Sequence, residues 1–167
     1  MARAGFYAVE SGKISFRRDG HWYSDDERID NPRIALLFSR SIRRAAEGGY
    51  FLQVGDERAS IVVEDTPYVV KSVEGDIQNG FSVILNDESR EALAPESLEI
   101  GADNVLYCRV KQGEFRARFL RPAYYHLSHC LETDGRGGFL FAMGGKRYPL
   151  RAAGTGRPGR GPHDLSR

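Results

Sequence analysis

The chain of 167 residues is 41% hydrophobic and 28% charged, a composition typical of a globular protein with one compact domain or two small halves. Its formal net charge of +1 is unevenly placed, because residues 151–167 hold four arginines and one aspartate and leave the rest slightly acidic. This balance argues against a general nucleic-acid binder, which carries a basic patch or stripe.

The ends of the chain and its cysteines bear on where the protein works. Residues 1–13 lack the long apolar stretch of a signal peptide, and no later segment is long enough to span a bilayer. Two cysteines, Cys108 and Cys130, do not make a disulfide framework for a chain of this size. We therefore expect a reduced, cytoplasmic protein without a membrane partner. Residues 151–167, rich in Gly, Pro and Arg, lack apolar side chains to bury and are predicted to be disordered.

Residues 1–65 predict a β-rich half with one helix. The stretch 14–24 has the pattern of a hairpin, because its Asp-Gly pair can take the positive φ angles of a tight turn. A helix is expected over 32–47, starting at an Asn-Pro pair and ending at a double glycine. Two strands follow in 50–64 around a Gly-Asp turn.

Residues 66–150 predict a second half built in a similar way. Four strands come first, "YVVKSVE", "FSVILND", "VLYCRV" and "EFRARFL". A helix is expected over 122–132, and the strands "GFLFAM" and "KRYPL" complete this half.

The two helices have similar surroundings in the sequence. Residues 28–58 align with 118–147 after one single-residue gap, with an arginine, a proline, a double glycine, a turn glycine and a closing arginine in register. Chance could supply the order of strands and helix, but these shared positions favour an internal repeat. The predicted fold class is therefore α+β, with two duplicated β-rich halves that each place antiparallel strands around one helix.

Arg121 stands where the cap of the second helix is expected. Pro122 suits the first helical position, and the residue before it is normally Ser, Thr, Asp or Asn. A cation there leaves the first-turn N–H groups free and faces the positive end of the helix dipole. Free N–H groups and a fixed cation together favour an anion, either Asp65 or another carboxylate of the facing half, or a phosphate of a ligand. The alternative is that Arg121 extends into solvent and water satisfies the donors.

Three further side chains have both a structural and a functional interpretation. Tyr125 lies off the buried stripe of its helix and close to Arg121, so it either stacks on a ring of a ligand or packs against the other half. The same choice applies to Trp22, for which a core position is favoured. Asp65 ends a strand before a proline turn, where it either caps local donors or joins the halves by pairing with Arg121 or Arg109.

Signals for catalysis, metal or cofactor binding are weak. A dinucleotide-binding loop requires a strand before it and a helix after it, but Pro158 interrupts the glycine pattern "GTGRPG" in 154–159 and only eight residues follow it. His126, His129 and Cys130 lack the further ligands that zinc needs. No Gly-x-Ser-x-Gly elbow is present, and Cys108 lies in the middle of a strand without a histidine beside it. We expect a non-enzymatic protein without a metal or a cofactor.

Several motifs occur together in a recognisable order. "RRDGHWY", "NPRIALLF", "GGYFLQV", "IVVEDTPYVV", "LYCRV", "RARFLRPAYYHL" and "GGKRYPL" resemble the bacterial domain of unknown function 1285 family over about residues 13–150. The resemblance implies a duplicated fold whose second half is like a pleckstrin-homology domain. It also implies a site between the halves suited to a nucleotide-like ligand, and a role in signalling. The run 86–100 departs from the family; we still count its Asn86 among the candidate site residues.

The sequence thus predicts a non-enzymatic protein that binds a small anionic or nucleotide-like ligand between its halves. The alternative is an interaction module that uses the pleckstrin-like half to bind a peptide or partner protein. The predicted ligand-binding residues are Arg121, Tyr125, Asp65, Arg109, Trp22 and Asn86.

Overall fold

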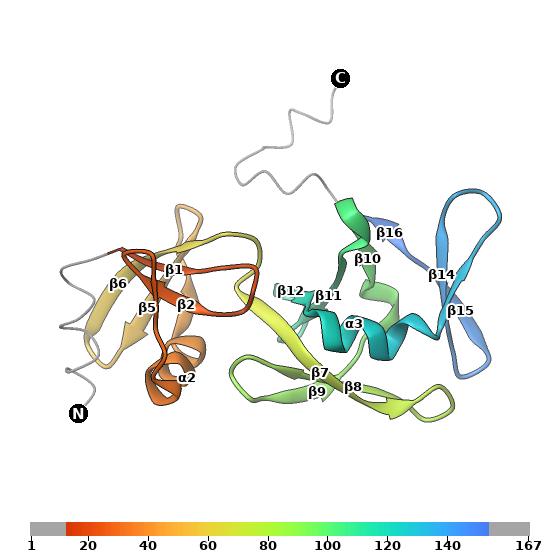
Figure 1. Ribbon diagram of the computed structural model, residues 1–167, viewed down its shortest axis with the longest axis horizontal. Helices are drawn as coiled ribbons and strands as arrows, with labels where there is room; N and C mark the ends of the chain where they lie inside the picture. Colours follow the sequence, from red (N-terminus) through yellow and green to blue (C-terminus); the bar gives the residue numbers. More distant parts are fainter. Residues whose placement is uncertain (1–12, 154–167) are drawn as a thin grey trace, which may run out of the picture.

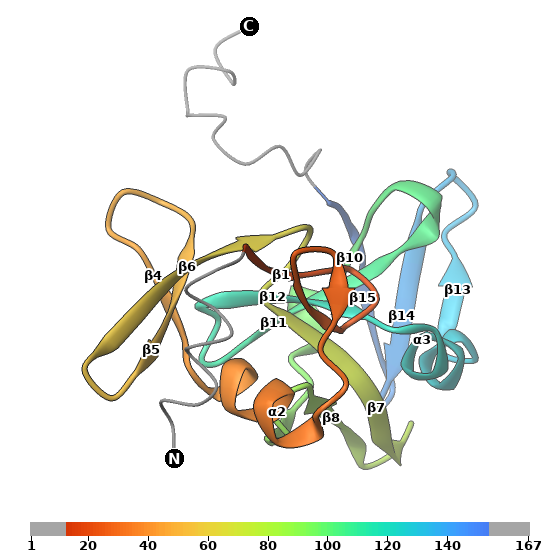
Figure 2. The ribbon, with the colours of Figure 1, turned by 60° about the vertical axis from the view of Figure 1, so that its left-hand side comes forward.

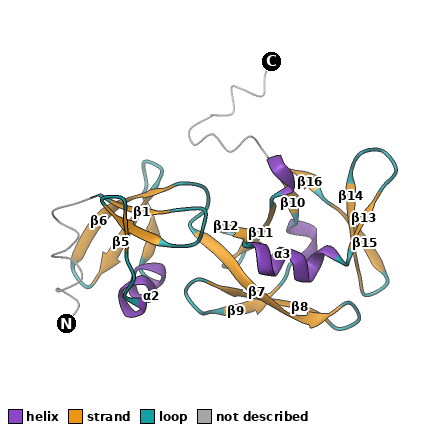
Figure 3. Cartoon of the chain, viewed as in Figure 1, coloured by secondary structure: helices purple, strands orange, loops and turns teal. Residues whose placement is uncertain are grey.

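The computed structural model describes residues 13–153 and shows a mostly β protein in two parts that meet at β7 (Figure 1). Strands dominate both parts (Figure 3), and between residues 13 and 153 each part has one α-helix. The elements of the first half are β1 (Ile14–Phe16), β2 (Trp22–Ser24), β3 (Glu27–Arg28), α2 (Pro32–Arg40), β4 (Ile42–Arg44), β5 (Tyr50–Val54) and β6 (Glu57–Val63).

The second half begins with a long strand, and three short antiparallel strands and the two-residue β16 follow its helix. Its elements are β7 (Tyr68–Asp76), β8 (Gly80–Leu85), β9 (Arg90–Ala92), η1 (Pro95–Ser97), β10 (Glu99–Ile100), η2 (Ala102–Asn104), β11 (Leu106–Val110), β12 (Phe115–Phe119), α3 (Arg121–Ser128), β13 (Leu131–Thr133), β14 (Phe139–Met143), β15 (Lys146–Pro149) and β16 (Arg151–Ala152).

The strands form three sheets. The first half is one sheet in the order β3-β2-β1-β6-β5-β4, antiparallel except for the parallel pair of β1 and β6. The second half has a sheet in the order β16-β10-β11-β12-β7-β8-β9 and a separate meander, β13-β14-β15. The α+β class is therefore compatible with the fold. The strand order is that of an open sheet, and a pleckstrin-like barrel stays a prediction.

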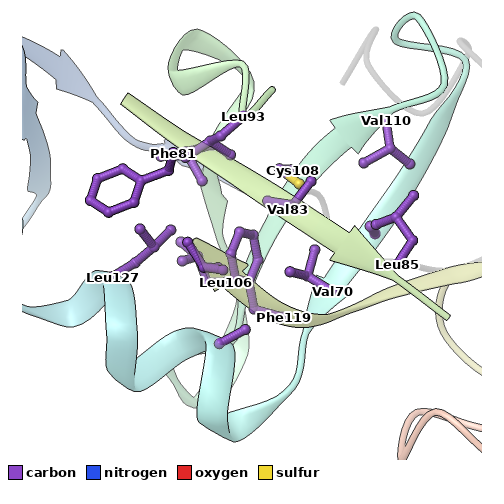
Figure 4. Packing of buried hydrophobic residues seen from close by; sticks show 14 of the residues in the cluster. Val70, Phe81, Val83, Leu85, Leu93, Leu106, Cys108, Val110, Phe119 and Leu127 are labelled. Carbon is purple, nitrogen blue, oxygen red and sulfur yellow. The ribbon is translucent and has the colours of Figure 1, made fainter. Parts of the chain in front are cut away.

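Each half has its own hydrophobic core. In the first, Trp22 is buried against Phe16 and Phe38, with ring centroids 4.8 and 5.5 Å away. In the second, Leu127 of α3 points toward the side chains of β8, including Phe81 (Figure 4). Each fully buried aromatic or aliphatic side chain contributes about 1.5–3 kcal/mol, so two separate clusters stabilise two structural units.

The first helix starts where the sequence predicts and ends earlier. The Asn31 side chain accepts hydrogen bonds from the N–H groups of the first turn, and α2 ends at Arg40 instead of residue 47. Residues 42–44 form β4 because they pair with β5 and bury Ile42 in the core. The double glycine predicted to stop the helix makes the β4–β5 turn, with positive φ at both residues.

The second helix is shifted by one residue and is shorter than predicted. It begins at Arg121, ends at Ser128 and has Leu120 at its N-cap position, without a side-chain cap. Leu120 packs against the first core, next to the β1–β2 turn. The N-cap residue therefore makes an apolar contact between the halves and no capping hydrogen bond, and Arg121 is the first helical residue.

The predicted tail begins later than residue 151. Residues 151 and 152 form β16, parallel to β10, and the Ala153 N–H donates to the Ile100 carbonyl at 2.8 Å. The free backbone edge of β10 accounts for this, because pairing needs no apolar side chains. Residues 154–167, which hold the rest of the predicted tail, lie outside the described residues.

The two proposed repeats share a local order and differ in their sheets. A helix and a three-stranded meander follow each other in both, as α2 with β4-β5-β6 and as α3 with β13-β14-β15. In the first half β6 also pairs with β1, whereas β13-β14-β15 remains a sheet of its own. The duplication stays a prediction, supported by local order and not by sheet topology.

Candidate functional site

The segment between the halves is held by Asp65. Its carboxylate accepts hydrogen bonds from the Arg118 guanidinium and the Tyr107 hydroxyl, both at 2.8 Å. The β11–β12 register places Tyr107 opposite Arg118, which brings both donors to the same acid. The predicted partners of Asp65, Arg121 and Arg109, are therefore wrong, and the carboxylate ties the junction to the second half.

A buried chain of hydrogen bonds joins the two cores. Ser39 of α2 accepts from the Trp22 indole N–H at 2.9 Å and from the Asn86 side-chain amide at 3.0 Å. The Asn86 side-chain oxygen accepts from the Val69 N–H at 2.9 Å. All four residues are at least 92% buried, so the predicted site residues Trp22 and Asn86 are occupied with internal partners.

A crevice of about 690 Å³ lies between the halves. It lies where the end of α2 contacts the β8–β9 turn; Figure 2 shows α2 beside β8. The first half supplies three arginines to it and the second half supplies a lysine and two aromatic rings. Its lining residues are Arg40, Ile42, Arg43, Arg44, Tyr68, Asp87, Lys111, Glu114 and Phe115.

Two of the four cations in the crevice have no acidic partner in the part of the chain that the structure describes. Arg43 donates to the Ile42 carbonyl at 2.9 Å, and Arg44 donates to the Glu114 carbonyl. Arg40 donates to the Asp87 carbonyl at 3.2 Å and lies 3.9 Å from Glu88. Arg43 and Arg44 are exposed, so their charges are available to an anion.

The Lys111 ammonium is shared with Asp87. It lies 2.6 Å from the carboxylate and 2.9 Å from the Ser89 hydroxyl. Burial raises the pKa of Asp87, but the hydrogen bonds from Lys111 and Ser89 outweigh burial and hold this pKa below its ordinary value. Asp87 is thus ionised at neutral pH and fixes Lys111 at the wall of the crevice.

Tyr68 forms the floor between these charges. Burial, followed by the nearby Asp87 charge, raises the pKa of Tyr68 to about 12, so the hydroxyl is neutral at physiological pH. Within residues 13–153 this hydroxyl has no hydrogen-bond partner, so it can donate to a ligand oxygen.

Arg121 and Tyr125 lie together at a different cavity. This second cavity, of about 370 Å³, belongs to the second half and is also lined by Arg118 and Tyr124. Tyr125 is 58% exposed, and the Arg121 side chain pairs with no carboxylate of the described residues. The sequence correctly predicted that Arg121 and Tyr125 are neighbours, and their binding role stays a prediction.

Arg109, the last of the predicted site residues, lies away from both cavities, whereas three arginines that were not predicted line the crevice. Arg109 is exposed on β11 and does not line the crevice or the second cavity. The crevice arginines were visible in the sequence "RSIRR", three arginines within five residues. Arg40 is the last residue of α2, and Arg43 and Arg44 lie on β4. Their meeting with Lys111 depends on how the halves pack.

Other chemistry-bearing side chains are structural in this fold. Cys108 and Cys130 are buried free thiols, and burial raises the pKa of each. His126 lies edge-on to the Phe81 ring at 6.0 Å. Over the described range 13–153, no group of three or more His, Cys, Asp or Glu side chains could hold a metal ion. No helix in that range is long and apolar enough to cross a membrane.

The fold and the crevice define a two-part, mostly β protein with a basic junction. Residues 8–66 match the model of the DUF1285 N-terminal domain, described as a domain of unknown function. Over these residues the chain is similar to the N-terminal domain of the DUF1285 family. No curated protein matches the sequence.

Two solved structures of DUF1285 family proteins have a similar fold. The one from Silicibacter pomeroyi DSS-3 is 20% identical with a TM-score of 0.65, covering 93% of this chain and 83% of that one. The one from Shewanella baltica OS155 is 18% identical with a TM-score of 0.56, covering 72% of this chain and 93% of that one. At this identity the likeness supports the fold alone, so the nature of a ligand has to be argued from the residues of the crevice.

Proposed function

We propose that the protein is a non-enzymatic binding protein that holds a small anionic, phosphate-bearing ligand in the crevice between its halves. The supporting observation is that Arg43 and Arg44 are exposed and have no acidic partner within residues 13–153, and that both line the crevice together with Lys111. A guanidinium presents parallel N–H donors that match phosphate oxygens, so arginines that line one crevice suit such an anion.

The residues suit binding better than catalysis. The Cys108 thiol is buried in the second core and its raised pKa disfavours the thiolate that a nucleophile needs. The crevice contains arginines, a lysine paired with Asp87 and a neutral tyrosine, all of which can hold an anion. A ligand that contacts both halves would stabilise their mutual arrangement, which fits a signalling role. Two unpaired buried thiols fit a cytoplasmic location.

A thermal-shift experiment with pyrophosphate tests this proposal. A ligand that binds only the folded protein at about 100 times its Kd adds about 2.7 kcal/mol of stability. We expect a rise in Tm for the unaltered protein, and loss of that rise in the double variant Arg43→Gln/Arg44→Gln. Arg33→Gln is the matched control, because Arg33 is exposed on α2 away from the crevice. If Arg121→Gln abolishes the rise while the double variant keeps it, the site is the second cavity.

The alternative function is binding of an acidic peptide. The observation that favours it is β4, the outer strand of the first sheet, whose residues line the crevice. An extended segment could pair with this edge and place its carboxylates on the arginines. A peptide of alternating Glu and Val can be titrated while the NMR signals of the β4 backbone amides are followed. Chemical-shift changes of these amides on peptide binding, together with no binding of pyrophosphate, would favour this function.

A further inference from the structure

The aromatic rings of the crevice are already covered by its own cations. The Lys111 ammonium lies 5.3 Å from the centroid of the Tyr68 ring. The Arg44 guanidinium carbon lies 4.7 Å from the Phe115 centroid and 5.8 Å from the Tyr50 centroid. A cation in this position occupies the ring face that a planar ligand would need.

The rings also pack on one another. Tyr68 and Phe115 meet edge to face, with centroids 5.3 Å apart and planes at 71°. Tyr50 packs on Phe115 at 6.3 Å. Tyr68 is 6% exposed and Phe115 is half-buried, so neither ring presents an open face. Stacking of a base needs such a face, because it depends on broad contact between two planes.

Charge, in contrast, is available in the crevice. Its lining has four basic and two acidic side chains, and one of the acids, Asp87, is engaged by Lys111. Arg43 and Arg44 follow one another in the chain and hold no carboxylate among the described residues. Because both residues line the crevice, their charges suit an anion with several charged oxygens.

We propose that the crevice selects a compact, non-aromatic polyanion of the condensed-phosphate class, and that a nucleoside group adds nothing to its binding. This inference rests on the proposed function and narrows its ligand. A nucleotide is held by the crevice through its phosphates alone, with its base in solvent.

Calorimetric titration of the full chain at one ionic strength tests the inference. The ligands are pyrophosphate and tripolyphosphate, each compared with the nucleotide that has the same number of phosphates, ADP and ATP, and adenosine alone. We expect ADP to bind no more tightly than pyrophosphate, ATP no more tightly than tripolyphosphate, and adenosine not to bind. A Kd for ADP tenfold below that for pyrophosphate overturns this inference and leaves the proposed function intact. No binding by any of the four anions overturns both.

Two arginine variants test the covered ring directly. Arg44→Ala removes a charge and uncovers Phe115, whereas Arg43→Ala removes the same charge and leaves that ring covered. Both variants should bind pyrophosphate more weakly than the unaltered protein. In Arg44→Ala the ratio of the affinity for ADP to that for pyrophosphate should rise about tenfold, which is the size expected of one added base–ring contact. In Arg43→Ala this ratio should stay constant. The same ratio in both variants would show that the arginine does not block stacking. Unchanged circular dichroism and Tm in the absence of ligand establish that each variant is folded.

Discussion

Replacement of Ser39 by alanine should destabilise the protein far more than the loss of one oxygen suggests. The Ser39 hydroxyl accepts from two donors, the Trp22 indole N–H at 2.9 Å and the Asn86 amide at 3.0 Å, and all three residues are buried. Alanine leaves both buried donors without an acceptor. Each unsatisfied buried donor costs about 1–3 kcal/mol, so the expected loss is about 2–6 kcal/mol.

Urea unfolding followed by tryptophan fluorescence measures this loss, because Trp22 is the single tryptophan of the chain and reports on the altered site. Ser60→Ala, on the exposed face of β6, is the control and should change the free energy of unfolding by less than about 0.5 kcal/mol. A loss below about 1 kcal/mol for Ser39→Ala would refute the reasoning, since it would mean that the two donors find other partners.

Three further predictions concern single side chains. The folded state holds the pKa of Asp87 below its unfolded value, so the contribution of this carboxylate to stability is present above about pH 4 and is lost as the pH falls through the folded pKa. In Asp87→Asn the free energy of unfolding, measured with urea at several pH values, should therefore fall less steeply toward acid pH. Gly75→Ala should lower the free energy of unfolding by more than about 2 kcal/mol, because its Cβ would lie 2.2 Å from the Gly80 carbonyl oxygen. Gly48→Ala should lower it by about 1 kcal/mol, because nothing lies within 4 Å of the added Cβ. Equal urea midpoints for the two variants would contradict this. Arg121→Ala should leave the Tm without ligand unchanged, since this exposed cation has no carboxylate partner in the described chain; a loss of several degrees would reveal one.

Local turn and cap chemistry made parts of the fold predictable. The β1–β2 and β5–β6 hairpins follow from Asp-Gly and Gly-Asp pairs, and α2 starts at Asn31 because that side chain caps it. The end of α2 was not predictable in this way, since β4 forms by pairing with β5 across the turn. The same double glycine suits a helix stop and a hairpin turn, and long-range pairing decides between them.

The candidate site depends still more on long-range packing. The sequence brought Arg121 and Tyr125 together correctly, because they are four residues apart on one helix. It missed the partner of Asp65, because strand register places Tyr107 beside Arg118. It also missed the crevice, since Arg43 and Lys111 come from different halves and meet when those halves pack.

The position of a bound anion tests the central claim most directly. Crystals of the full chain soaked in tungstate, a heavy oxyanion, would report it by anomalous scattering. The strongest peak is expected in the crevice, within hydrogen-bond distance of the Arg43 and Arg44 guanidinium groups. A peak at Arg121 and Tyr125 with none in the crevice would contradict the claim and move the site to the second cavity.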